Sequence, residues 1–167
     1  PELTLVSDRM TPEALWAFGR VGGQEVSPDG STVLYGVSYY SIEHNKGNRE
    51  LYTVSVNGGN STRITTSPKS EFNAVWRPDG KKIGFLYSDG GSVQLWEMNP
   101  DGSGRTKVSE VEGGMTGFKY SPDQKRILFT SDVLRALRSW MLKSTHPHYN
   151  FYLYFSHICF VMKQLFS

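Results

Sequence analysis

The sequence has 167 residues, a formal net charge of +2, 38% hydrophobic residues and 13% aromatic residues. These values suit a globular protein rich in strands and exclude a chain that is disordered over most of its length. Basic residues do not gather in one stretch, so no nucleic-acid partner is predicted. The single cysteine, Cys159, excludes an intramolecular disulfide.

Residues 1–20 are predicted to form a lead-in with one short helix. Thr11 is suited to the N-cap, Pro12 to the first helical position and Glu13 to the first turn, where a negative charge is favourable. Gly19 is expected to end the helix. The first ten residues show no apolar segment typical of a signal peptide.

A Pro-Asp pair recurs along the chain, with its prolines at positions 28, 78 and 122. Proline fixes φ at the second position of a tight turn, and aspartate bonds its own backbone two residues on. Gly30 and Gly80 can close the turn with a positive φ, whereas the third copy carries Gln124 instead. If Gln124 keeps that conformation, the cost is about 1 kcal/mol. Alternating apolar residues after each pair predict a hairpin strand.

A second, glycine-rich turn comes after each of the first two Pro-Asp turns, at residues 57–59 and 101–104. The segments entering these turns, residues 51–54 and 95–98, lie 44 residues apart with apolar side chains in corresponding places. Four short strands in about 44 residues is the size of one β-propeller blade. Residues 21–133 are therefore predicted to form about two and a half four-stranded antiparallel blades of an incomplete, all-β propeller. The extra polar residues 39–49 are expected to form a protruding loop.

The sequence changes character after Val133. Residues 134–167 have no Asp, Glu or Gly, although 16 acidic residues precede them, and they hold three of the four histidines. We expect this tail to lie outside the propeller, with the third blade lacking its second hairpin. Two alternatives remain for it: an authentic helix over residues 134–143, or a segment produced by a shifted reading frame or a cloning scar. Its apolar part is too short to span a bilayer.

No catalytic, cofactor-binding or metal-binding residue is predicted. The nucleophile motif Gly-x-Ser-x-Gly of serine hydrolases is absent, and Ser103 between Gly102 and Gly104 belongs to a hairpin turn. His44 is expected in a loop. His146, His148 and Cys159 match no standard metal-site spacing. Trp76 and Trp96 could form a stacking surface, but their period-two positions favour packing between blades.

Three segments together resemble the N-terminal part of a known peptidase family. They are residues 10–16 leading into 26–30, residues 95–104 and residues 120–123. The Pro-Asp turns and the repeat length are similar to TolB-like and prolyl oligopeptidase propellers. The whole pattern resembles S9-type serine peptidases of the dipeptidyl or acylaminoacyl kind, from a bacterium that secretes the enzyme to the periplasm.

That resemblance implies a propeller of seven or eight blades stacked on an α/β-hydrolase domain that cleaves short peptides. The propeller limits which substrates enter, and the hydrolase domain carries Ser, Asp and His. This chain would then be a non-catalytic propeller fragment, meeting its peptide substrate only through the intact enzyme, in the periplasm or outside the cell. The alternatives are a TolB-like periplasmic protein-binding propeller without activity, or an independent small β-sandwich.

A chain with so few blades is predicted to self-associate. Each blade buries its faces against neighbours, and an incomplete set exposes apolar faces. Sedimentation velocity across a concentration series should show oligomers or aggregates. A monomer with a sharp, reversible thermal unfolding transition would contradict this prediction.

Overall fold

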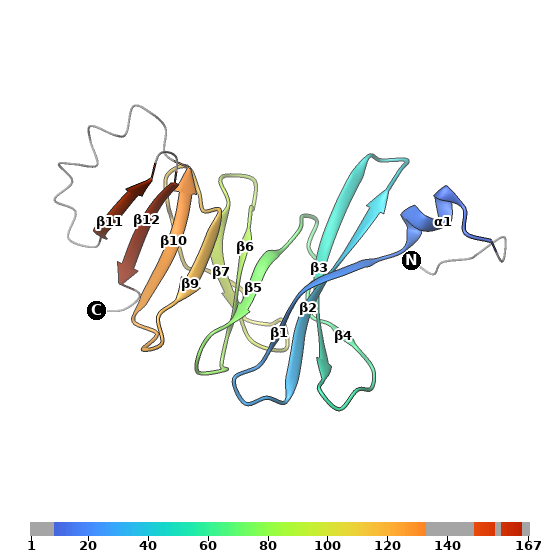
Figure 1. Cartoon of the computed structure of the whole chain (residues 1–167), viewed down its shortest axis with the longest axis horizontal. Coiled ribbons are helices and arrows are strands. Elements are labelled where there is room, and N and C mark those ends of the chain that lie inside the picture. The colour runs from blue at the N-terminus through green and yellow to red at the C-terminus, as the bar shows by residue number, and fades with distance from the viewer. Residues whose placement is uncertain (1–8, 133–148, 156–157, 165–167) are drawn as a thin grey trace.

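The computed structural model describes residues 9–132, 149–155 and 158–164. It contains three four-stranded antiparallel sheets standing side by side, with one short helix at the N-terminal end (Figure 1). The first sheet has the order β1-β2-β3-β4, the second β5-β6-β7-β8, and the third β11-β12-β10-β9. The predicted fold class is confirmed: the sheets are blades of a β-propeller.

The elements of the first sheet are α1 (Pro12–Ala17), β1 (Arg20–Val26), β2 (Thr32–Ser41), β3 (Lys46–Ser55) and β4 (Thr62–Arg63). Those of the second are β5 (Phe72–Trp76), β6 (Ile83–Tyr87), β7 (Gln94–Met98) and β8 (Thr106–Lys107). Those of the third are β9 (Gly117–Tyr120), β10 (Arg126–Asp132), β11 (Tyr149–Phe155) and β12 (Ile158–Gln164).

The short N-terminal helix α1 begins as the sequence predicts. The Thr11 hydroxyl accepts a hydrogen bond from the Ala14 backbone nitrogen at 3.2 Å, so Thr11 is the N-cap. The helix ends at Ala17, and Phe18 is already extended. Within the described residues no helix is both long and apolar enough to cross a bilayer.

The extra residues of the first repeat form paired strands rather than the expected loop. β2 and β3 are each 10 residues long and pair from Thr32↔Ser55 to Ser41↔Lys46. The hairpin projects beyond the rest of the first sheet (Figure 1). Continued pairing supplies partners for backbone groups that a loop would leave to water, and Tyr39 and Tyr40 favour extended structure.

The three Pro-Asp turns have one geometry. Each aspartate Oδ1 accepts from the backbone nitrogen two residues on, at 3.0 Å for Asp29, 3.0 Å for Asp79 and 3.1 Å for Asp123. The closing residues all have positive φ: +73° at Gly30, +69° at Gly80 and +59° at Gln124. Gln124 therefore does adopt the left-handed conformation at the third turn.

The apolar core is divided into two clusters, one between each pair of neighbouring sheets. The first includes Leu34 and Leu51 from the first sheet and Ile83, Phe85 and Met98 from the second, all at most 1% exposed. The second joins the other face of the second sheet to the third and comprises Leu86, Leu95, Met115, Phe118, Ile127 and Phe129, with partly buried side chains around it. Each sheet is therefore stabilised by its neighbours rather than by a central core.

The third sheet departs from the sequence-based expectation. β12 pairs with β10, and β11 pairs with β12 at the sheet edge. The expectation that this sheet lacks a second hairpin is therefore wrong, because aromatic and β-branched residues make residues 149–164 good strand formers. In the first two sheets the strands pair in sequence order. In the third, the last strand, β12, pairs with β10, and the preceding strand, β11, lies at the edge. The helix considered for residues 134–143 lies outside the described residues.

Replacing Gln124 with glycine should stabilise the protein. The change removes about 1–2 kcal/mol of backbone strain from the folded state. Glycine also increases the conformational entropy of the unfolded chain, which costs about 0.4–1 kcal/mol of stability. We therefore expect the free energy of unfolding to rise by roughly 0.5–1 kcal/mol. Urea unfolding of Gln124→Gly measures this. The matched control is Gly80→Gln, which should destabilise by a similar amount. No gain in the first variant together with no loss in the second would contradict the conclusion that this turn position strains a residue other than glycine.

The Asp79 turn should make stability depend on pH. A hydrogen bond from Arg77, at 2.9 Å between Nη2 and Oδ2, holds the pKa of the Asp79 carboxyl below its usual value of 3.8. A lowered folded-state pKa adds stability above pH 3.8 that is lost as pH falls through the folded-state value. Asp79→Asn should therefore destabilise at pH 7, and less so below pH 3.8. Urea unfolding across pH measures this, with exposed Asp89→Asn as control; a pH-independent difference would contradict the argument.

Candidate functional site: the junctions between sheets

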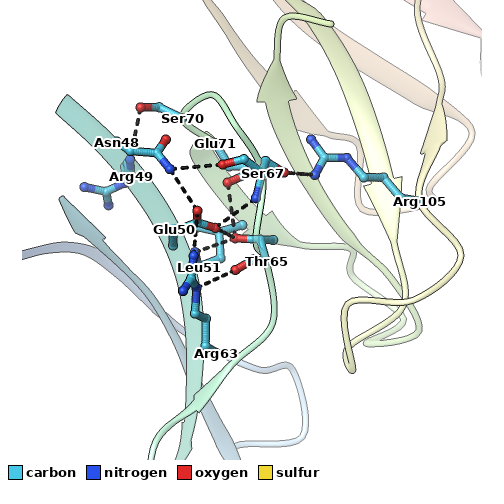
Figure 2. A network of polar contacts seen from close by, with 10 residues as sticks. All are labelled: Asn48, Arg49, Glu50, Leu51, Arg63, Thr65, Ser67, Ser70, Glu71 and Arg105. Carbon is cyan, nitrogen blue, oxygen red and sulfur yellow. Dashed lines mark hydrogen bonds and ion pairs between the residues drawn. The ribbon is translucent and has the colours of Figure 1, made fainter. Parts of the chain in front are cut away.

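The crossover from β4 to β5 carries the densest polar network among the described residues. It joins the outermost strand of the first sheet to the first strand of the second, and its side chains converge on Glu50 of β3 (Figure 2). Apolar side chains lie beside the network, which is why its polar groups need partners within the protein.

A single hydroxyl lies at the centre of this network. Thr65 Oγ1 accepts from the Leu51 backbone nitrogen at 2.9 Å and lies 2.7 Å from Glu50 Oε2 and 3.2 Å from Glu71 Oε2. A hydroxyl has one proton to donate, so at any moment it serves one of the two carboxylates. The shorter distance favours Glu50. Thr65 therefore ties the crossover to β3 and brings two acidic groups to the same place.

Two arginines neutralise these buried carboxylates. Arg63 Nη2 lies 2.9 Å from Glu50 Oε1, and Arg105 Nη1 lies 2.8 Å from Glu71 Oε1. The Glu71 side chain is 0% exposed, so its charge needs a paired partner. Arg105 lies in the β7–β8 connection, directly before β8, and its ion pair fixes the crossover to the second sheet.

Aromatic rings of the second sheet hold Arg105 in place. Its guanidinium carbon lies 4.7 Å from the ring centroid of Phe85, 4.0 Å from that of Tyr87 and 5.6 Å from that of Trp96. Stacking over ring faces is favourable for a cation and leaves the in-plane donors free for a carboxylate. The ring cluster therefore orients the group that pairs with Glu71.

The same arrangement recurs 44 residues later with neutral side chains. Ser109 Oγ accepts from the Leu95 backbone nitrogen at 2.8 Å and donates to Gln94 Oε1 at 2.8 Å. Met115 Sδ, 3.1 Å from the Ser109 hydroxyl, takes the place of the Glu71 carboxylate. A buried hydroxyl between the third strand and the following crossover is thus a repeated feature of both junctions.

Two further contacts join neighbouring sheets. The Trp76 backbone nitrogen donates to Glu25 Oε2 at 3.2 Å, and burial raises the pKa of Glu25. The Tyr120 phenol donates to Glu97 Oε1 at 2.7 Å, and burial raises the pKa of this tyrosine. A side chain at Gly84 would collide with the Tyr120 ring, so the glycine admits it.

The serine and the histidine considered from the sequence both lie in turns of the described chain. Ser103 bonds Asp101 and Asn99 within its hairpin turn. His44, the one histidine described, contacts the Ser41 hydroxyl at 3.0 Å in the exposed β2–β3 turn. No group of three metal-ligating side chains occurs within the part of the chain that the structure describes.

The remaining sequence candidates fall elsewhere. His146 and His148 lie outside the described residues, and Cys159 is placed only as part of strand β12. Trp76 is buried and Trp96 packs against the same cluster, so packing between blades, not a stacking surface, is confirmed for both. Sequence reasoning missed the junction network, although the matching positions of Thr65 and Ser109 in the 44-residue repeat were a usable signal.

Comparison with known proteins agrees with this architecture. A family model described as "TolB beta propeller domain" matches residues 17–143. The sheets define the chain as a β-propeller protein, and the match shows that it belongs to the TolB β-propeller domain family.

Relatives of known sequence include peptidases. The chain is 44% identical over 130 residues to dipeptidyl-peptidase 5 of Porphyromonas gingivalis, a match that covers 78% of this chain and 19% of that protein. It is 37% identical, over the same shares, to the dipeptidyl-peptidase 5 of Porphyromonas endodontalis. The chain thus spans about a fifth of the length of these relatives.

Solved structures show the same fold. An acylaminoacyl peptidase of Pyrococcus horikoshii superposes with a TM-score of 0.60 at 20% identity, covering 72% of this chain and 18% of that one. A putative TolB of Agrobacterium tumefaciens gives 0.53 at 25% identity, covering 64% and 36%. This chain is therefore a propeller related both to peptidases and to TolB.

Removing the hydroxyl at the first junction should cost more than removing it at the second. Thr65→Val leaves the Leu51 amide unpaired and takes a donor from a carboxylate, for an expected loss of about 3 kcal/mol. Ser109→Ala removes the equivalent neutral contacts, for an expected loss of about 1.5 kcal/mol. Urea unfolding of both variants measures the difference. Equal losses, or the reverse order, would show that the charged groups of the first junction add nothing to its stability.

Proposed function

We propose that this chain is the N-terminal propeller region of a serine-type peptidase that acts on short peptides. The observation that carries the proposal is the 44% identity over 130 residues to a dipeptidyl peptidase. In that relative the matched segment is only 19% of the protein, which leaves room for a separate catalytic domain. In this chain, Gly-x-Ser-x-Gly is absent from the sequence.

Within such an enzyme the propeller would control access to an α/β-hydrolase domain. The junctions support this role, because hydrogen bonds and ion pairs tie each crossover to a flanking sheet, and the Trp76–Glu25 and Tyr120–Glu97 hydrogen bonds join neighbouring sheets. A rigid ring admits peptides by size, whereas the chemistry belongs to the other domain. We further propose that the enzyme works in the periplasm or is secreted.

A second candidate function is a TolB-like propeller that binds proteins in the periplasm and has no enzymatic activity. The family model and the 25% identity to a putative TolB favour it. The two candidates predict different coding sequences downstream of the propeller. A hydrolase sequence favours the peptidase, and further repeats ending in a stop codon favour the binding protein.

The test is to sequence the gene from the codon for Asp123 onward and to translate it in all three frames. We expect one frame to resume Pro-Asp repeats and later to encode Gly-x-Ser-x-Gly. The full-length product should then release dipeptides from short peptides and lose this activity when the motif serine is replaced by alanine. Absence of the motif from every frame would reject the peptidase in favour of the binding propeller.

A further inference from the structure

A pocket of about 390 Å³ lies between helix α1 and the end of the β2–β3 hairpin. Its wall combines two aromatic rings, one aliphatic side chain and three polar side chains, in the order Trp16, Tyr40, Ile42, Ser41, Asn45 and Lys46. This volume and this mixture of apolar wall and few polar groups are usual for sites that bind small ligands.

The rings of this pocket are held in place by close backbone contacts. A Cβ added at Gly19 would lie 2.7 Å from Val37, so the segment after α1 lies directly against β2. A Cβ at Gly47 would lie 2.9 Å from the Tyr40 ring, so the glycine lets this ring lie across the hairpin. The Trp16 and Tyr40 rings meet edge to face at 6.1 Å. These contacts place the Trp16 and Tyr40 rings against each other between α1 and the hairpin.

Arg20 adds a positive charge beside these rings. Its guanidinium carbon lies 5.1 Å from the Trp16 ring centroid and 4.6 Å from that of Tyr40. As at Arg105, stacking orients the planar group and leaves its in-plane N–H donors available. Arg20 is exposed, so these donors are open to a ligand.

Neither cation of this region has a carboxylate partner among the described residues. Arg63, Arg77 and Arg105 all form ion pairs, whereas Arg20 and Lys46 form none. The acidic residues of the same elements, Glu13 of α1 and Glu43 of the hairpin turn, also lie beyond ion-pair distance of these two cations. Among residues 9–132, the site therefore has positive charge without an ion-paired carboxylate, next to aromatic surface.

We propose that Arg20 and the pocket beside it together bind a short peptide whose last residue is aromatic or apolar, with Arg20, which is not part of the pocket wall, taking the C-terminal carboxylate. The carboxylate would pair with Arg20 through two parallel N–H···O bonds, with Lys46 adding positive charge, and the last side chain would pack on Trp16 and Tyr40. Arg20 stacks directly on the rings, so the anion and the apolar group must be adjacent in the ligand. A C-terminal aromatic residue meets this condition because both groups share one Cα.

This site lies on the propeller itself and goes beyond the proposed function, because it does not depend on a hydrolase domain. Its test uses the full chain alone, so failure here leaves the gene-sequencing test of the peptidase unaffected. Isothermal titration calorimetry with acetyl-Gly-Phe as the free acid should show binding. The same peptide as its C-terminal amide should bind at least about tenfold more weakly, the loss expected when a charge-assisted pair is removed.

Substitutions locate the interaction. Arg20→Gln should weaken binding of the free acid at least about tenfold and leave the weak binding of the amide unchanged, while Trp16→Ala should weaken both. The matched control is Lys125→Gln, which removes an exposed positive charge at the third Pro-Asp turn and should leave both affinities unchanged. An unchanged far-UV circular dichroism spectrum of Arg20→Gln shows that any loss is local.

Three outcomes of the titrations with these two peptides would overturn the proposal. They are no binding of the free acid, equal binding of acid and amide, and full affinity in Arg20→Gln. Acetyl-Glu-Phe-amide carries its carboxylate on a side chain instead. If this peptide binds as well as the free acid, the assignment of the C-terminal group is overturned.

Discussion

The arrangement of the sheets depends on one buried hydroxyl at each junction. Thr65 and Ser109 each accept the amide of a leucine in the third strand and donate to the side chain of the residue before it. A propeller has no common core, so each sheet is positioned by its apolar packing on its neighbours and by the polar contacts of the crossovers. Hydrogen bonds are directional, and a buried amide left unpaired costs about 1–3 kcal/mol. The hydroxyl therefore fixes the crossover, and with it the position of the next sheet.

The two junctions keep the same geometry with different electrostatics. The first pairs two carboxylates with two arginines, one from each sheet, whereas the second uses Gln94 and Met115 at the corresponding places. Buried charges make the first junction intolerant of losing any one member. In both networks the central hydroxyl has its partners, although Asn48 Oδ1 and Arg105 Nη2 of the first are buried without a hydrogen bond. The positive charge of Arg20, by contrast, lies outside the junctions, at the start of β1 beside the Tyr40 ring of the projecting hairpin.

Local turn chemistry made much of the fold predictable from sequence. Pro-Asp turns fix backbone geometry within four residues, and even Gln124 takes the conformation its position requires. The β11–β12 hairpin was not predicted because no turn motif marks it, and its pairing with β10 joins strands that are distant in the sequence. The pocket was not predicted, since it brings Trp16 together with a hairpin more than 20 residues away in sequence. Tertiary proximity of this kind leaves no local pattern.

Native-state hydrogen exchange at two backbone amides tests the role of the junctions most directly. Leu51 and Leu95 donate to buried hydroxyls, and not to water, so their amides should be among the slowest to exchange in the first two sheets. NMR-detected exchange of the full chain measures this residue by residue. Protection of both amides at the level of the central strand pairs is the result we expect. Exchange at the rate of the exposed loops would show that the hydroxyls do not hold the sheets together.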